Sequence, residues 1–260
     1  MAARVFASGV AAILCAGALV SAAPAAADAS CGAVLGGAWD DHDGNCATQL
    51  TSQRQAIMTM TVGYPRELID DPTAGPSMRD YLRNRVDSWR TTAVTMVRAN
   101  EASVDSKVYS HGPVTSVVFH EYWWSVGNMQ NNAYHTYSFD LASGRRLQLA
   151  DLVTSLTALS PLVRPYLDPV LDAAQPPHDP GTYPFTPDKF EPQPDGSGYS
   201  SNYRAFALTG DQLVLYMPDA PLQHENPFPQ DRFVWSMDGG TVEVHVPLSA
   251  LTSVLRPQYR

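Results

Sequence analysis

Two hydrophobic periodicities follow each other along the first half of the chain and predict a mixed α+β fold. Residues 55–62 alternate with a period of two, which is typical of a strand. From Ser77 to Val97, apolar residues recur at three and four positions, which predicts an amphipathic helix capped by Ser77 with Asp80 as its partner. Further β-rich runs cover residues 104–110, 114–124 and 133–139. We therefore expect an antiparallel sheet of at least three strands, with the helix packed on one face.

The second half of the chain mixes helical and strand patterns. Residues 151–173 are apolar at helical spacing but contain three prolines, and an interior proline costs about 3 kcal/mol, so we expect a broken or kinked helix. Residues 175–201 are rich in proline, glycine and aspartate, which indicates an extended surface excursion. Strands are predicted at residues 203–208, 213–217 and 241–246, and Pro247 is expected to open a short final helix.

The first 27 residues have the pattern of a signal peptide. Arg4 supplies a positive start, residues 5–20 are apolar or small, and residues 25–27 are alanines that signal peptidase accepts. No basic stop-transfer cluster follows, which favours cleavage over a membrane anchor. We therefore expect a secreted, extracellular protein with no membrane span after cleavage. Residues 28–145 should form an N-terminal α+β half and residues 146–260 a C-terminal half of one continuous globular unit.

The cysteine count indicates one disulfide. Cys15 lies in the signal peptide, and Ile13 and Leu14 do not fit a lipoprotein signal, so Cys31 and Cys46 remain as a pair in an oxidising compartment. Closing a loop of about 15 residues would contribute about 3 kcal/mol. The acidic segment 40–45 within this loop lacks the ligand spacing of an EF-hand, which indicates a solvated turn. We expect no metal site and no cofactor.

The composition is acidic. The formal net charge is −9, and only Lys107 and Lys189 are lysines among the 17 basic residues. Such a surface repels nucleic acid and anionic lipid, and it would steer a cationic partner toward the protein. The charge could equally serve solubility alone.

Several segments between residues 116 and 251 carry a family likeness. They are residues 134–140 (YHTYSFD), 143–144 (SG), 147–152 (LQLADL), 202–209 (NYRAFALT) and 242–251. With the export signal and the early cysteine pair, they resemble the mycobacterial secreted immunogenic antigens of the RsiV-like superfamily. The resemblance implies an RsiV-like α+β fold in which helices pack on a curved antiparallel sheet.

The functions implied by this resemblance are mixed. One branch of the superfamily is the extracellular part of an anti-sigma factor that binds lysozyme, the antigens have no settled role, and one related member is described as an ester hydrolase. Family members often carry a Gly-Gly-small-His turn before the second hairpin strand. Here residues 127–130 (GNMQ) occupy that place, so an activity that depends on that histidine is not expected.

Catalytic motifs are sparse. No Gly-x-Ser-x-Gly elbow occurs, and Ser197, in the segment 195–199 (DGSGY), is the nearest match to a serine nucleophile, although this composition is ordinary in turns. His120, His135 and Asp140 could complete a triad. A triad is recognised from the arrangement of its side chains in space, and the presence of these residue types alone does not establish one. His120 and Glu121 begin like a zinc-protease motif, which then fails because Trp124 occupies the second histidine position.

Aromatic residues give the remaining clue. Successive strand residues point to opposite faces, so Tyr122, Trp123 and Trp124 place aromatic rings on both faces of one strand. Either helices cover both faces, or an aromatic face is free to bind a partner, and the loop with Phe228 and Trp235 could extend it. Our expectation is a non-catalytic extracellular binding module for a cationic host or envelope protein or a glycan. The alternative, from another class, is a short-chain ester hydrolase of the serine type.

Overall fold

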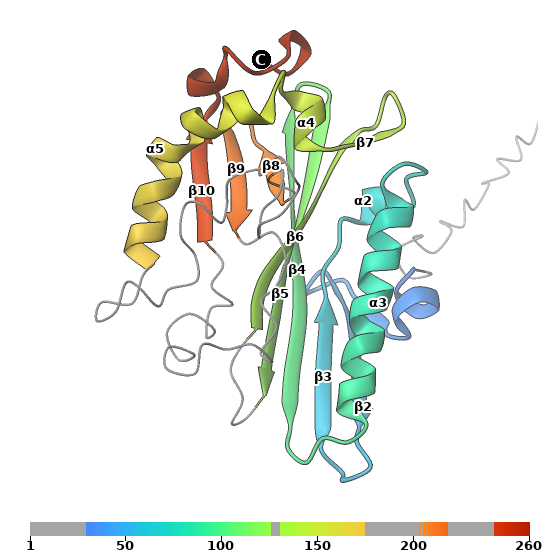
Figure 1. The fold of residues 1–260 in the computed structure, drawn as a ribbon. Coiled ribbons are helices and arrows are strands. Elements are labelled where there is room, and N and C mark those ends of the chain that lie inside the picture. The colour runs from blue at the N-terminus through green and yellow to red at the C-terminus, as the bar shows by residue number, and fades with distance from the viewer. Residues whose placement is uncertain (1–29, 126–130, 175–202, 204, 218–241) are drawn as a thin grey trace, which may run out of the picture.

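The computed structural model describes residues 30–125, 131–174, 203, 205–217 and 242–260. Its elements form two β-sheets (Figure 1). The larger has seven strands in sequence order from β1 to β7, and the smaller has three in the order β10, β9, β8. The α+β class and the mainly antiparallel pairing predicted from the sequence are confirmed.

The described chain begins with a disulfide-bridged hairpin. A π-helical turn, η1 (Cys31–Leu35), leads into β1 (Ala38–Asp40), and β1 pairs with β2 (Asn45–Thr51). The Cys31–Cys46 disulfide is confirmed, with an S–S distance of 1.97 Å. The Asp40 carboxylate accepts the backbone N–H groups of His42 and Asp43 in the exposed turn, which matches the expected solvated turn. Neither strand of the hairpin was predicted. Strand β1 lies in the bridged segment that was interpreted as a loop, and β2 begins at its end and continues into residues for which no element was predicted.

Three long strands dominate the larger sheet. These are β4 (Asn100–His111), β5 (Val114–Ser125) and β6 (Asn131–Asp140), followed by the short β7 (Arg145–Leu147). On the other side, β3 (Ile57–Val62) pairs with β2 in antiparallel and with β4 in parallel orientation. The parallel pair was not foreseen. It is possible because the helical segment between β3 and β4 returns the chain to the starting end of the sheet.

Helix α3 (Gly75–Ala93) covers one face of this sheet, and the shorter α2 (Arg66–Ile69) precedes it. The buried residues of α3 repeat at the helical spacing that predicted this helix; they include Met78, Leu82, Val86 and Trp89. The predicted cap was wrong. The helix begins at Gly75 with Pro76 in its first turn, and the Asp71 carboxylate accepts the N–H groups just before it, so Ser77 lies inside the helix.

The smaller sheet consists of β8 (Phe206–Leu208), β9 (Gln212–Met217) and β10 (Val242–Pro247). Short helices α4 (Leu149–Leu152), η2 (Leu248–Leu251) and η3 (Pro257–Tyr259) and the long α5 (Leu156–Ala174) share its core. Three prolines lie within α5, and Figure 1 shows that the helix bends as it passes the sheet, as the sequence predicted. The predicted closing strands and short final helix are confirmed; their grouping into a separate sheet was not foreseen.

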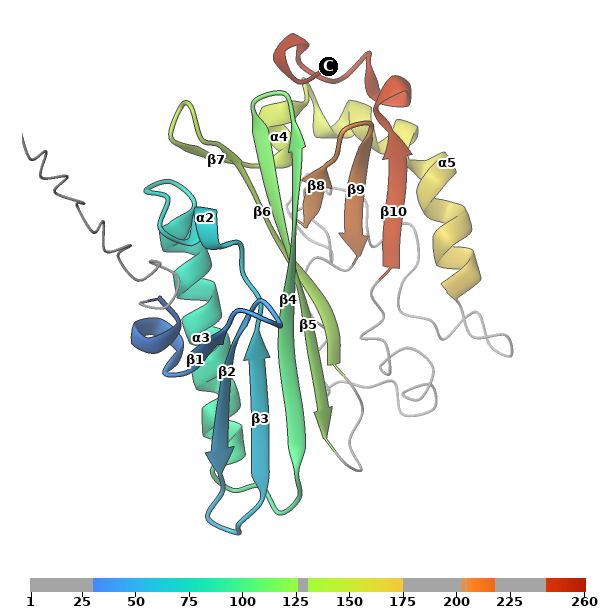
Figure 2. The same ribbon diagram turned by 180° about the vertical axis from the view of Figure 1, so that it is seen from behind.

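The two sheets join through side chains on the face of β5 and β6 opposite α3. Ser116 and Ser138 are both buried, with 2.8 Å between their hydroxyl oxygens, and Ser116 Oγ accepts the backbone N–H of Leu208 at 3.1 Å. Val118 packs nearby against residues of β8 and β9. Figure 2 shows β2 and β3 beside β4, on the side of the molecule away from the small sheet.

The predicted signal peptide, including Cys15, and the excursion at 175–201 lie outside the described residues. Among the helices that the structure describes, none is long and apolar enough to cross a membrane.

Candidate functional site

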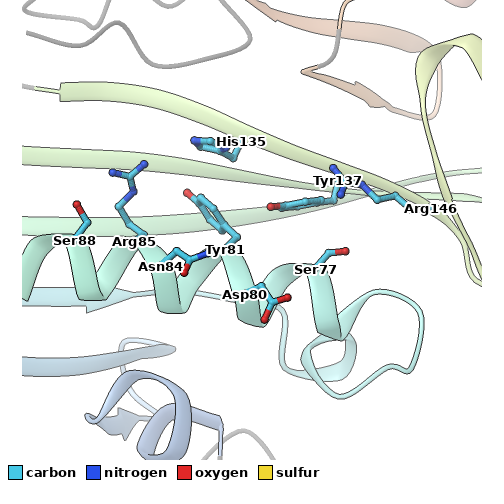
Figure 3. Close-up of a pocket in the computed structure, with 9 residues that line it drawn as sticks. All are labelled: Ser77, Asp80, Tyr81, Asn84, Arg85, Ser88, His135, Tyr137 and Arg146. Carbon is cyan, nitrogen blue, oxygen red and sulfur yellow. The ribbon is translucent and has the colours of Figure 1, made fainter.

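A pocket lies between α3 and the strands β6 and β7. Its volume is about 590 Å³. Helix α3 forms one wall and the strands form the other, as Figure 3 shows. The lining residues are Ser77, Asp80, Tyr81, Asn84, Arg85 and Ser88 from α3, His135 and Tyr137 from β6, and Arg146 from β7. The lining residues on α3 lie three or four positions apart, so they share one side of the helix. This side is next to the one that packs against the core.

A buried carboxylate belongs to the same cluster. Glu121 of β5 is fully buried and has the strand parity of Phe119, so its side chain points toward α3 and not toward the small sheet. A buried charge is costly unless it is paired and hydrogen-bonded. The side chains around Glu121 therefore determine whether this core is stable.

Three side chains surround the Glu121 carboxylate. The Tyr81 hydroxyl donates to Oε1 at 2.7 Å. Arg85 Nε is 2.9 Å from Oε2, and His135 Nε2 is 3.2 Å from Oε1. Neither nitrogen contact has hydrogen-bond alignment; the Arg85 contact is an ion pair, and the His135 contact places an imidazole nitrogen against the carboxylate. One carboxylate from β5 thus ties together residues of α3 and β6.

The cluster shifts two acid–base equilibria. Burial by itself would raise the pKa of Glu121, but the contact with His135 and the charge of Arg85 outweigh it, so the pKa lies below the ordinary value. Burial, followed by the neighbouring Glu121 charge, raises the pKa of Tyr81 well above its ordinary value. Near neutral pH, Glu121 is a carboxylate and Tyr81 a hydrogen-bond donor.

At the β7 side, an arginine lies over an aromatic ring. The Arg146 guanidinium carbon is 4.6 Å from the centre of the Tyr137 ring. The Tyr137 ring also approaches Tyr81 edge-on, with 6.1 Å between centroids. Burial raises the pKa of Tyr137, although the Arg146 charge opposes the shift. The pocket therefore combines apolar ring surfaces with hydroxyl, amide, carboxylate and guanidinium groups.

Comparison with known proteins identifies the fold. No protein-family model matches the sequence, and no curated protein matches it. A DUF3298 family protein from Pseudomonas aeruginosa PAO1 is similar in structure, with a TM-score of 0.51 and 14% identity, over 83% of this chain and 94% of that chain. This chain has the fold of that protein. A DUF3298 member from Bacteroides fragilis NCTC 9343 has a TM-score of 0.45 and 15% identity, over 82% of this chain and 93% of that one.

The structure from Pseudomonas aeruginosa shares the α+β architecture expected from the sequence, so the predicted fold class is confirmed. At 14% identity, the structural similarity establishes the fold but gives no evidence for an activity. Nothing in these comparisons supports the finer resemblance to the mycobacterial antigens.

The DUF3298-type fold separates the predicted catalytic residues. His120 points to the face opposite α3 and stacks on Tyr134, with 4.6 Å between ring centroids, whereas His135 lies in the pocket. Asp140 is at the far end of β6, where its carboxylate accepts the Ser143 N–H. The Ser143 side chain and then this backbone hydrogen bond lower the pKa of Asp140. The two histidines and Asp140 therefore do not form one site. Ser197 lies outside the described residues.

The predicted aromatic surface is divided between the two faces of β5. Trp123 is half-buried and packs against the core under α3, whereas Tyr122, also half-buried, points to the other face. At Val118, the small sheet covers that other face, and no helix of the described residues does so. The side chain of Trp124 and the residues Phe228 and Trp235 lie outside the described part, so a binding role for these aromatics stays a prediction.

Sequence reasoning missed Glu121, Tyr81, Arg85 and Arg146 as a group. The sequence did contain a sign of the role of Glu121. It lies in a strand of apolar and aromatic residues, and a carboxylate in such a strand requires partners if it is buried. The partners could not be found in the same way. They come from a helix and another strand, and their approach depends on register.

Proposed function

We propose that this chain is an exported, non-catalytic binding protein whose pocket between α3 and β6–β7 takes a segment of a glycan. The observation that carries the proposal is the pocket lining. Tyr137, which is half-buried, offers apolar ring surface for the C–H face of a sugar ring, and Asp80, Asn84 and Arg85 offer donors and acceptors for hydroxyl groups. Specific pockets generally combine apolar walls with a few fixed polar groups in this way.

The site is also held in place before a ligand arrives. Tyr81 and Arg85 are fixed from below by Glu121, at 2.7 and 2.9 Å, and Tyr137 lies under Arg146. Side chains that are already ordered lose little conformational entropy on binding. A cationic protein, the other expected partner, is supported by the net charge of −9. The two arginines of the pocket do not favour such a partner at this site.

Filling the pocket tests this proposal. Ser88 is exposed on α3 and lines the pocket, so Ser88→Trp should abolish binding to an oligosaccharide array without loss of fold. Thr91 is exposed on the same helix outside the lining, and Thr91→Trp is the matched control. Equal binding by Ser88→Trp and the wild-type protein, or no binding to any oligosaccharide by either, would overturn the proposal.

Export rests on the sequence pattern and has its own test. We propose that cleavage follows the alanines at 25–27, so that the secreted protein begins near Asp28. Mass spectrometry of the N-terminus from the culture medium would show that start. A chain that keeps Met1 and stays within the cell would contradict the proposal.

A second function, hydrolysis of short-chain esters, is favoured by one observation. His135 lines the pocket, and its Nε2 is 3.2 Å from a buried carboxylate, which is the arrangement that orients a histidine as a general base. Turnover of p-nitrophenyl acetate or butyrate that is lost in His135→Ala and kept in His120→Ala would support it. No turnover removes this function, and turnover unchanged by Ser197→Ala removes that serine as the nucleophile.

A further inference from the structure

The pocket holds two arginines in an acidic protein. The chain has 26 acidic and 17 basic residues, whereas the charged side chains of the lining are Arg85, Arg146 and one carboxylate, Asp80. Asp80 is largely exposed and lies 3.5 Å from Arg83 on the same helix. Together with the buried Glu121 beneath Arg85, the pocket holds two arginines and two carboxylates, so it lacks the acidic excess by which the rest of the protein repels an anionic ligand.

The positive groups are not equally available. Arg85 is neutralised from below, because its Nε is 2.9 Å from the buried Glu121 carboxylate, and the same carboxylate holds His135. Arg146 has no carboxylate partner within the described part of the chain and contacts the Tyr137 ring. Its guanidinium is exposed, so it retains donors for a ligand.

Stacking on Tyr137 prepares Arg146 for an oxyanion. A guanidinium above an aromatic ring at 4.6 Å is held by a cation–π contact, which leaves the N–H groups at its edge free. Those edge donors form a planar fork that matches the two oxygens of a carboxylate. In Figure 3, Arg146 and Ser77 lie toward one end of the pocket, and Arg85 and Ser88 lie toward the other.

Building on the proposed function, we infer that the ligand is an acidic glycan and that Arg146 receives the carboxylate of one of its sugars. The exposed part of the Tyr137 ring and the polar groups of α3 then contact neutral parts of neighbouring sugars. Arg146 is the specificity residue for charge, and the remaining lining provides affinity for the sugar chain.

An array that carries carboxylate oligosaccharides beside the same oligosaccharides as neutral methyl esters tests this inference. The acid forms should bind on the order of tenfold more tightly than their esters, as expected for one charge-assisted contact. Arg146→Gln should remove this preference, so that the acid and the ester forms bind the variant with equal affinity. Arg145→Gln, at the exposed neighbouring position outside the lining, should keep the preference.

The outcomes separate the two proposals. Equal binding of acids and esters overturns the inference and leaves the glycan proposal standing. A preference that survives in Arg146→Gln also overturns the inference. No binding of either form by the wild-type protein overturns both proposals.

Discussion

The Tyr81 hydroxyl donates a hydrogen bond to the Glu121 carboxylate at 2.7 Å and so joins α3 to β5 through the core. Arg85 and His135 complete the surroundings of this carboxylate. The buried carboxylate contacts three side chains that line the pocket, Tyr81, Arg85 and His135. Stability of the fold and shape of the site therefore depend on the same residues.

Removing the charge of Glu121 should destabilise the protein. Glu121→Gln leaves Arg85 without its carboxylate, and loss of one partner of a buried pair is costly; because the Arg85 side chain is 25% exposed, we expect roughly 2 to 4 kcal/mol. Urea unfolding measures this free energy. Glu101→Gln, at an exposed position of β4, should change stability by less than about 0.5 kcal/mol. Equal midpoints for the two variants would contradict the prediction.

Stability should also depend on acid through Glu121. Its pKa is lowered on folding, so the carboxylate contributes stability fully above its ordinary pKa of 4.5 and loses that contribution as the pH falls through the folded value. Near pH 7, the wild-type protein should therefore exceed Glu121→Gln in unfolding free energy, and the difference should shrink below about pH 4.5. The difference in unfolding free energy between the two proteins cancels the contributions of the carboxylates that both contain. A difference that grows on acidification would show that the sign is wrong.

The junction of the two sheets gives a third prediction. Ser116 Oγ accepts the buried N–H of Leu208 at 3.1 Å, and Ser116→Ala would leave this donor unsatisfied. We expect a loss of about 1 to 3 kcal/mol by urea unfolding. The matched variant Ser110→Ala changes an exposed serine of β4 and should be nearly neutral. A loss for Ser110→Ala as large as that for Ser116→Ala would rule out the hydrogen bond as the cause.

The disulfide should stabilise the N-terminal hairpin. Cys31 and Cys46 enclose a short loop, and opening it by reduction should cost about 3 kcal/mol in unfolding free energy. Denaturant unfolding with and without a reducing agent measures the cost, and the Cys31→Ser, Cys46→Ser double variant serves as a control that the agent should not affect. An unchanged midpoint after complete reduction would contradict this role.

Local patterns predicted the main elements because each contains its own periodicity. The alternation of β3 and the spacing of Met78, Leu82 and Val86 on α3 reflect burial of one face of each element. The short strands β1 and β2 escaped prediction because the segment was interpreted from its cysteines and turn residues. Helix α3 started earlier than expected because Asp71 and Pro76, rather than Ser77, determine its first turn.

The site depended on information that local patterns lack. His135 reaches Glu121 only because β5 and β6 pair with Phe119 opposite His135, and a slip of one residue would turn His135 to the face of the small sheet. Arg85 and Tyr81 meet the carboxylate through the rotation of α3 on the sheet. The pairing of Arg146 with Tyr137 likewise arises from β7 returning beside β6.

The central claim is that ligand binds between α3 and β6–β7. Amide NMR spectra of the labelled protein, recorded with and without an array-selected oligosaccharide, test it most directly. We predict shifts concentrated in residues 77–88, around His135 and Tyr137, and at Arg146, with the Ser88→Trp spectrum unchanged on addition. Shifts confined to the small sheet or to the N-terminal hairpin would contradict the claim.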